Sequence, residues 1–70
     1  MKIKINGEER EFSAGLTLTA LILELGSKPD RLAIELNREI VPRREWAETR
    51  LQEGDELEIV HFVGGGNLRT

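Results

Sequence analysis

The chain has 70 residues, of which 39% are hydrophobic, so it can bury one small core and forms a single domain. It has no cysteine and one histidine, which excludes a disulfide framework and a structural zinc site of cysteine and histidine ligands. The net charge of -3 and the few aromatic residues exclude a general nucleic-acid binder, which carries a basic face with interleaved aromatics.

The first predicted element is a β-hairpin. Ile3 and Ile5 alternate with lysines, so they share one face of an extended segment. Asn6 and Gly7 follow, and both residue types tolerate the positive φ angles that a tight turn between twisted strands requires. A second short segment ends at Phe12.

A short amphipathic helix follows the hairpin. Thr17 can cap its start, and Gly26 can adopt the left-handed conformation at its end. Leu23 lies off the apolar face, and we expect it at the edge of the core. The face itself has the spacing i, i+3, i+4 and i+7, at Leu18, Leu21, Ile22 and Leu25.

The pattern returns to extended from Pro29. Apolar residues alternate from Leu32 to Leu36, which predicts a strand. The apolar pair at 40–41 predicts a second, short strand, which Pro42 ends because proline has no N–H to donate to a ladder.

The last part of the chain predicts an irregular segment and a closing strand. The sequence RREWAETRL indicates a turn or a single helical turn that carries Trp46 inward, because so large an aromatic side chain is rarely left in water. Gly54 allows the chain to reverse in the next loop. The residues then alternate along a closing strand, with Leu57, Ile59 and His61 on one face and Glu58, Val60 and Phe62 on the other.

This order of elements predicts an α+β fold in which one main helix crosses a mixed sheet of four to five strands. In so short a chain the first and last strands can lie side by side as a central parallel pair, which is the ubiquitin-like β-grasp. We expect the domain to comprise residues 1–63 and a flexible, glycine-rich tail to comprise residues 64–70.

No residue pattern predicts a catalytic or metal site. His61 is the only histidine that could activate a hydroxyl, and no nucleophile motif surrounds any serine or threonine. The final segment GGGNLRT is not a phosphate-binding loop, because it has no lysine and opens no helix. The glycines are therefore either a frayed end or a tail that enters a narrow channel of a partner protein.

The charge and hydropathy patterns bear on partners and location. Acidic residues gather at 53–58, and they form either a solvated face or a docking surface for a basic partner. The longest purely apolar run, 20–23, is too short for a membrane span or a signal segment. We therefore expect a cytoplasmic protein that binds neither nucleic acid nor membranes.

A set of motifs occurs in residues 36–66, LNREIVPRREWAETRLQEGDELEIVHFVGGG. It contains an Asn-x-x-(Ile/Val)-Val-Pro-Arg-x-x-Trp segment, a Gly-Asp loop and a glycine pair. This combination resembles the sulfur-carrier family of thiamine biosynthesis, ThiS, and the opening hairpin and capped helix fit the same family more loosely. The matching residues are Asn37, Val41, Pro42, Arg43, Trp46, Gly54, Asp55, Gly65 and Gly66.

The resemblance implies a protein sulfur carrier and not an enzyme. In this family a ubiquitin-activating-type adenylyltransferase uses ATP to adenylate the terminal glycine, which is then converted to a thiocarboxylate for thiazole formation. Gly65 and Gly66 are then the sulfur-carrying terminus, and a sulfur donor enzyme and thiazole synthase are further partners. The carrier itself binds no cofactor or metal. We expect the docking site for the activating enzyme at the residues that lead into the tail, Val60, Phe62, Val63 and Gly64.

The chain departs from the family pattern in one respect, because residues 67–70 follow Gly66 where members of the family end. A processed precursor, a misassigned gene end and a relative that binds without carrying sulfur each account for this, and we expect a protease to remove the four residues. Two alternatives to the family remain open. One is the small subunit of molybdopterin synthase, which usually has a proline-containing segment before its glycines, and the other is a noncovalent β-grasp interaction module.

Overall fold

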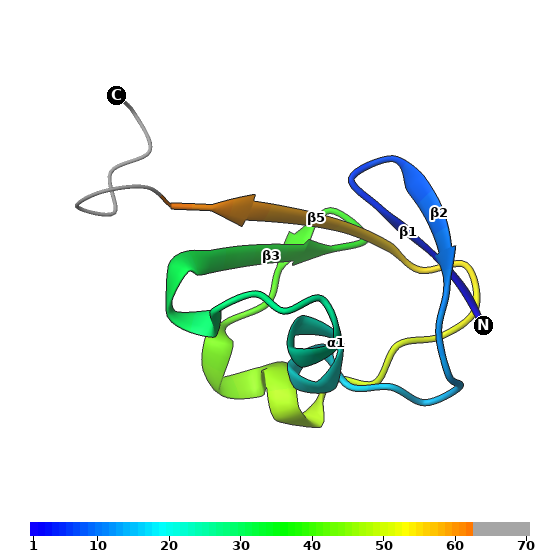
Figure 1. Cartoon of the computed structure of the whole chain (residues 1–70), viewed down its shortest axis with the longest axis horizontal. Helices are drawn as coiled ribbons and strands as arrows, with labels where there is room; N and C mark the ends of the chain where they lie inside the picture. The colour runs from blue at the N-terminus through cyan, green and yellow to red at the C-terminus, as the bar shows by residue number, and fades with distance from the viewer. Residues whose placement is uncertain (63–70) are drawn as a thin grey trace.

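Five strands form one mixed sheet in the computed structural model of the protein, which describes residues 1–62 apart from the side chain of Pro29. The strands are β1 (Lys2–Ile5), β2 (Glu8–Glu11), β3 (Leu32–Leu36), β4 (Glu39–Ile40) and β5 (Glu56–His61). Their order across the sheet is β2-β1-β5-β3-β4 (Figure 1). β1 and β5 pair in parallel, and the other neighbours are antiparallel. The first and last strands are thus adjacent, as the sequence predicts.

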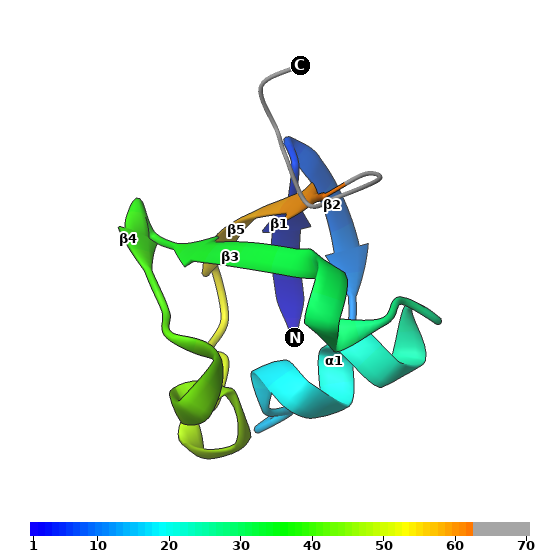
Figure 2. The ribbon, with the colours of Figure 1, turned by 90° about the vertical axis from the view of Figure 1, so that its left-hand side faces the viewer.

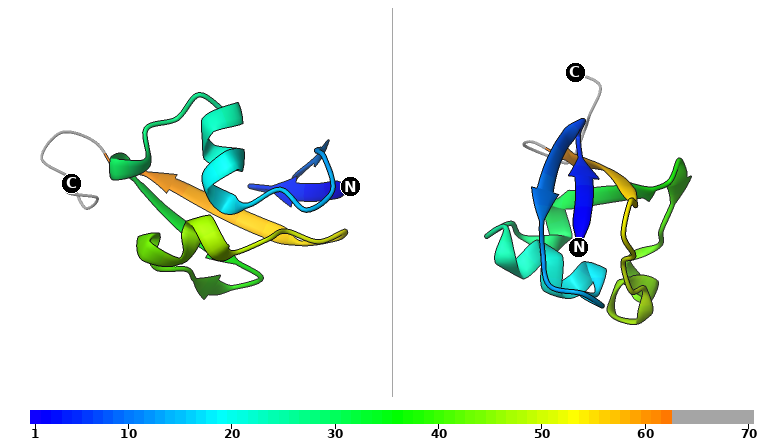
Figure 3. Two further views of the ribbon diagram at one scale, coloured as in Figure 1. Left: turned by 90° about the horizontal axis from the view of Figure 1, so that it is seen from below. Right: turned by 90° about the vertical axis from the view of Figure 1, so that its right-hand side faces the viewer.

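The helical segments cover one face of this sheet. They are the α-helix α1 (Leu18–Glu24) and the 3-10 segments η1 (Pro29–Arg31) and η2 (Arg43–Glu48). Figures 2 and 3 show α1 and η2 on the same side of the strands. In the part of the chain that the structure describes, no helix lies on the opposite face, which we call the outer face. One main helix on a five-stranded mixed sheet is the predicted α+β arrangement.

The hairpin between β1 and β2 turns where the Asn-Gly pair predicts it. Asn6 has a φ of 51° and Gly7 a φ of 84°, so both occupy the left-handed region that a two-residue type I′ turn needs. Ile5 faces Glu8 across the turn. This register buries Ile3 and Ile5 beneath the sheet and leaves the intervening lysines exposed.

Both ends of α1 are capped by the predicted residues. The Thr17 side-chain oxygen accepts a hydrogen bond from the Ala20 N–H at 3.2 Å. At the other end Gly26 has a φ of 74°, and the N–H of Ser27 donates to the Ile22 carbonyl at 3.2 Å. This geometry is a Schellman cap, which supplies a hydrogen-bond donor to a carbonyl that has no partner within the helix.

The apolar face of α1 is the one the spacing predicts. Leu18, Leu21 and Ile22 are buried, and Leu25 is half-buried at the helix end. Leu23 is more exposed than an edge position of the core, at 68%. It lies on the side of α1 that faces solvent.

Two local features differ from the sequence prediction. The residues from Pro29 to Arg31, where the sequence predicts an extended chain, form a 3-10 turn that is closed by the Arg31 N–H on the Lys28 carbonyl at 3.1 Å. β3 itself spans Leu32–Leu36, as the alternation of apolar residues predicts. β4 comprises residues 39–40 where the apolar pair predicts 40–41, although the Val41 N–H still reaches the Ile34 carbonyl at 3.0 Å.

Trp46 points inward from η2, as expected. Its side chain is 3% exposed, and its indole N–H donates to the Val41 carbonyl at 2.8 Å. The segment after η2 then pairs with the residues before α1, through the Leu51 N–H on the Leu16 carbonyl at 2.9 Å. The indole is therefore held between the sheet and the start of the helix.

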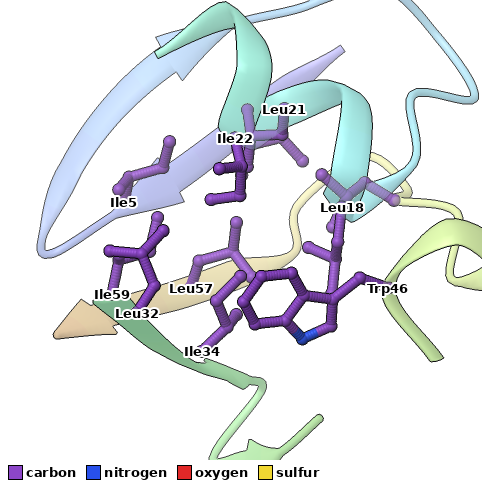
Figure 4. Close-up of a cluster of buried hydrophobic side chains, with 11 residues drawn as sticks. Ile5, Leu18, Leu21, Ile22, Leu32, Ile34, Trp46, Leu57 and Ile59 are labelled. Carbon is purple, nitrogen blue, oxygen red and sulfur yellow. The ribbon is translucent and has the colours of Figure 1, made fainter. Parts of the chain in front are cut away.

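The core lies between the sheet and these helical segments. Figure 4 shows the side chains of α1 directed toward the strands, with the Trp46 indole closing one end of the cluster. Because α1 and η2 cover the same sheet face, all of the deeply buried side chains belong to one layer. The cluster contains Ile3, Ile5, Leu18, Leu21, Ile22, Leu32, Ile34, Trp46, Leu51, Leu57 and Ile59.

The cap at Thr17 gives a test of this fold. Thr17→Ala removes the oxygen that accepts from the Ala20 N–H, and we expect the free energy of unfolding to fall by about 1 kcal/mol in urea denaturation. Thr19→Ala is the matched control, because this threonine lies inside α1 and its hydroxyl makes no hydrogen bond within residues 1–62. It should change the free energy by less than about 0.5 kcal/mol. Equal losses in the two variants would contradict the capping role.

Candidate functional site

The last strand places the end of the described chain in the middle of the sheet. β5 has β1 on one side and β3 on the other, and its inward residues Leu57 and Ile59 are buried. Phe62 follows the strand, and Val63 and the glycines at 64–66 come next in sequence. The glycine run therefore follows β5 in sequence after only two residues, Phe62 and Val63.

Backbone pairing of β5 extends further on one edge than on the other. Toward β3 it reaches beyond the strand, where the Phe62 N–H donates to the Arg31 carbonyl at 2.9 Å. Toward β1 the last backbone hydrogen bond is from the Asn6 N–H to the Leu57 carbonyl, at 2.9 Å. The end of β5 thus has a complete backbone ladder only on its β3 side.

The outer face carries apolar side chains close to the end of β5. Val60 is 42% exposed and lies opposite Ala33 of β3. Ile40, at the edge of the sheet, is 68% exposed and lies opposite Glu35. Both are exposed aliphatic side chains on a sheet face that no helix of the described residues covers.

Acidic side chains adjoin these apolar residues. Glu35 and Glu58 lie directly opposite each other on β3 and β5, and Glu56 follows along the same face of β5. Lys4 and Arg38 line the same hollow of about 240 Å³ and partly balance the charge. Like charges directly opposite each other destabilise a sheet, so packing does not explain why two glutamates occupy this pair.

The structure describes only part of the predicted docking site. Val60 is on the outer face, as the alternation along the strand predicts. Phe62 is half-buried, and it is not among the partly buried residues that pack against the core. Val63 and the glycines at 64–66 lie outside the described residues. The assignment of Val60 and Phe62 to partner docking stays a prediction.

The sequence analysis did not consider two further residues of the outer face, Ile40 and Ala33, as exposed surface residues. Ile40 belongs to an apolar pair that predicts only a short strand, and Ala33 is an inconspicuous member of β3. Pairing of Ile40 with Glu35 and of Ala33 with Val60 brings both to the outer face. Strict alternation within the pair at 40–41 could have indicated that one of the two residues points outward.

The described residues contain no group with the chemistry of a catalytic or metal site. Every buried side chain within residues 1–62 is hydrophobic, and no three acidic or histidine side chains there lie close enough to hold a metal ion. His61 is exposed. No helix within the same residues is long and apolar enough to cross a membrane.

Comparison with known proteins gives a family and a fold. The model of the ThiS family matches residues 3–66 of the chain. The sulfur carrier protein ThiS of Escherichia coli is 32% identical to it, over 94% of this chain and 100% of that protein. The crystal structure of a thiamine biosynthesis protein, ThiS, from Geobacter metallireducens superposes with a TM-score of 0.83 at 29% identity. That superposition covers 94% of this chain and 100% of the other.

Longer proteins also contain a similar segment. A thiazole synthase of Paramagnetospirillum magneticum is 52% identical over 96% of this chain, which corresponds to 21% of that protein. A thiazole synthase of Magnetococcus marinus is 46% identical over 94% of this chain and 20% of that protein. The chain therefore spans about a fifth of the length of these two relatives.

The glutamate pair on the outer face can be tested by a double-mutant cycle of Glu35→Gln and Glu58→Gln. We expect an unfavourable coupling of about 0.2–1 kcal/mol in the free energy of unfolding at low salt, because the two carboxylates repel each other. The coupling should shrink toward zero at about 1 M salt, where the Debye length is about 3 Å. The cycle cancels the contributions of Lys4 and Arg38. A coupling near zero at low salt would show that the two carboxylates do not repel each other measurably.

Proposed function

The chain belongs to the ThiS family of sulfur carriers in thiamine biosynthesis, and we propose that it carries sulfur as a thiocarboxylate on Gly66. The observation that carries this proposal is the extent of the family match, which runs from residue 3 through Gly66 and so includes the glycine pair. The fold supports the same conclusion, because β5 is a central strand of the sheet and the glycines follow it in sequence.

The proposed chemistry takes place at one carbonyl carbon. Hydrolysis of the Gly66–Asn67 peptide bond consumes water and leaves a carboxylate on Gly66. This carboxylate attacks the α-phosphorus of ATP and displaces pyrophosphate, which gives an acyl adenylate. A sulfur nucleophile at the oxidation level of sulfide then attacks the carbonyl carbon, AMP leaves, and a thiocarboxylate remains.

Partner enzymes supply the catalytic groups for these steps. The carrier contributes the reacting terminus and the surface that places it. Glycines suit this terminus, because a chain without Cβ atoms can pass through a channel that closes around the backbone and holds the carboxylate in line for attack. We infer that ATP is bound by a ubiquitin-activating-type adenylyltransferase and that a sulfur donor enzyme provides the nucleophile.

The longer relatives support thiazole synthase as the acceptor of the sulfur. Two proteins named thiazole synthase contain a segment similar to this chain within a longer polypeptide. Covalent linkage of two modules raises their effective concentration without any new contact. A carrier and a thiazole synthase that meet repeatedly gain from such linkage, so we propose that this carrier also delivers sulfur to a thiazole synthase.

The match to ThiS favours thiamine biosynthesis over the molybdopterin-synthase alternative. The noncovalent interaction module differs in a property that can be measured, because it requires no free carboxylate at Gly66. Activation of the terminus by ATP therefore separates it from a sulfur carrier.

We predict that the 70-residue form is inert with ATP and a cognate adenylating enzyme, and that a form ending at Gly66 releases pyrophosphate. The longer form holds the needed carboxylate in an amide bond. With a sulfur donor present, the intact mass of the shorter form should rise by the difference between sulfur and oxygen. Equal adenylation of the two forms would show that Gly66 is not the reacting terminus. Inactivity of the shorter form with every cognate enzyme would favour the noncovalent module.

We also predict that Phe62→Ala weakens the complex with the adenylating enzyme while the melting temperature stays within a few degrees, because Phe62 does not pack against the core. A loss of about 1–2 kcal/mol in binding free energy is typical for an aromatic contact residue. Leu23→Ala is the matched control, because it removes an exposed apolar side chain from α1, away from the outer face. Unfolding of the Phe62 variant would place this residue in the core, and equal weakening by both variants would argue against a specific contact.

A further inference from the structure

The β1–β2 hairpin turns away from β5 before β5 ends. The last paired residues of the two strands are Ile5 and Leu57, and the chain then enters the turn at Asn6. Ile59 lies further along β5, and its side chain is 7% exposed. Its N–H and carbonyl face the side that β1 has left, so neither can find a backbone partner there.

The side chain of Asn6 takes the place of the missing strand. Its Oδ1 accepts a hydrogen bond from the Ile59 N–H at 2.8 Å, and its Nδ2 donates to the Ile59 carbonyl at 3.3 Å. An amide side chain has one acceptor and one donor side by side, which is the pattern that a strand would present. Asn6 thus extends the ladder on the β1 side by one residue.

Few residue types could occupy this position. The φ of 51° at Asn6 favours asparagine, aspartate or glycine. Glycine keeps the turn but has no side chain, and aspartate keeps the acceptor but cannot donate to the Ile59 carbonyl. Asparagine therefore supplies both the turn and the pair of hydrogen bonds.

We propose that Asn6 is a positioning residue for the reaction at the tail. By holding Ile59 on the edge that β1 has left, it fixes the direction in which the chain leaves the sheet toward Gly66. The inference rests on the proposed sulfur-carrier function, because that function requires the terminus to reach a defined point in a partner. In this proposal Asn6 acts through the backbone of β5, by its two hydrogen bonds to Ile59.

A similar pair of hydrogen bonds at the start of β5 serves as a control. Asn37 also has a left-handed φ, of 50°, in the turn between β3 and β4. Its Oδ1 accepts from the Glu56 N–H at 3.0 Å, and its own N–H donates to the Glu56 carbonyl at 2.8 Å. Asn6 and Asn37 therefore hold the same strand by similar contacts, one near the tail and one at the opposite end.

The experiment compares Asn6→Gly, Asn6→Asp and Asn37→Gly in the form that ends at Gly66. Pyrophosphate release by the cognate adenylating enzyme is measured with the carrier as the varied substrate, below the melting temperature of every variant. We expect kcat for Asn6→Gly to fall by about tenfold while KM changes by less than about threefold, because docking is retained and the terminus is misplaced. The kcat of Asn6→Asp should lie between that of Asn6→Gly and that of the unsubstituted chain. Asn37→Gly should keep both constants within about twofold.

Equal losses in Asn6→Gly and Asn37→Gly would show that Asn6 only stabilises the fold, and an unchanged kcat in Asn6→Gly would also overturn the proposal. A second measurement does not depend on activity. Amide hydrogen exchange at Ile59 should become at least about tenfold faster in Asn6→Gly and stay unchanged in Asn37→Gly. Unaltered exchange at Ile59 would show that the Asn6 side chain does not hold this residue.

The two measurements separate this inference from the proposed function. If the unsubstituted form ending at Gly66 is not adenylated, the sulfur-carrier proposal fails, and the exchange data alone decide whether Asn6 holds β5. If that form is adenylated and Asn6→Gly reacts as fast, the carrier function stands and the positioning role is rejected.

Discussion

The parallel pairing of β1 with β5 is the constraint on which the rest of the structure depends. It joins segments from opposite ends of the described chain, and the helix and the β3–β4 hairpin must fit in the connection between them. Parallel strands need a long crossover, and here α1 supplies it on the inner face of the sheet. Leu57 and Ile59 consequently lie beneath α1, at the centre of the only core that so short a chain can build.

That arrangement gives the two faces of the sheet different surroundings, one buried under the helical segments and one exposed. The inner face holds the buried side chains, whereas the outer face keeps Val60 and Ile40 exposed beside a repelling pair of glutamates. Neither feature contributes to the core.

The proposed chemistry asks for a rigid strand followed by a narrow terminus. β5 is hydrogen-bonded to its neighbours on both edges, and where β1 departs the side chain of Asn6 replaces the backbone. In the proposed chemistry glycine suits the terminus, because a chain without Cβ atoms is thin.

The sequence by itself determined the elements whose signals are local. The Asn-Gly turn, the Thr17 cap and the apolar face of α1 depend on residues close in the chain, and the motif at Asn37 to Trp46 indicated the family. Only the tertiary structure decided which residues meet across the sheet. Glu35 faces Glu58, and Asn6 bonds to Ile59, because strand register brings together residues far apart in sequence. No local spacing encodes such a register, since it results from the packing of the whole core.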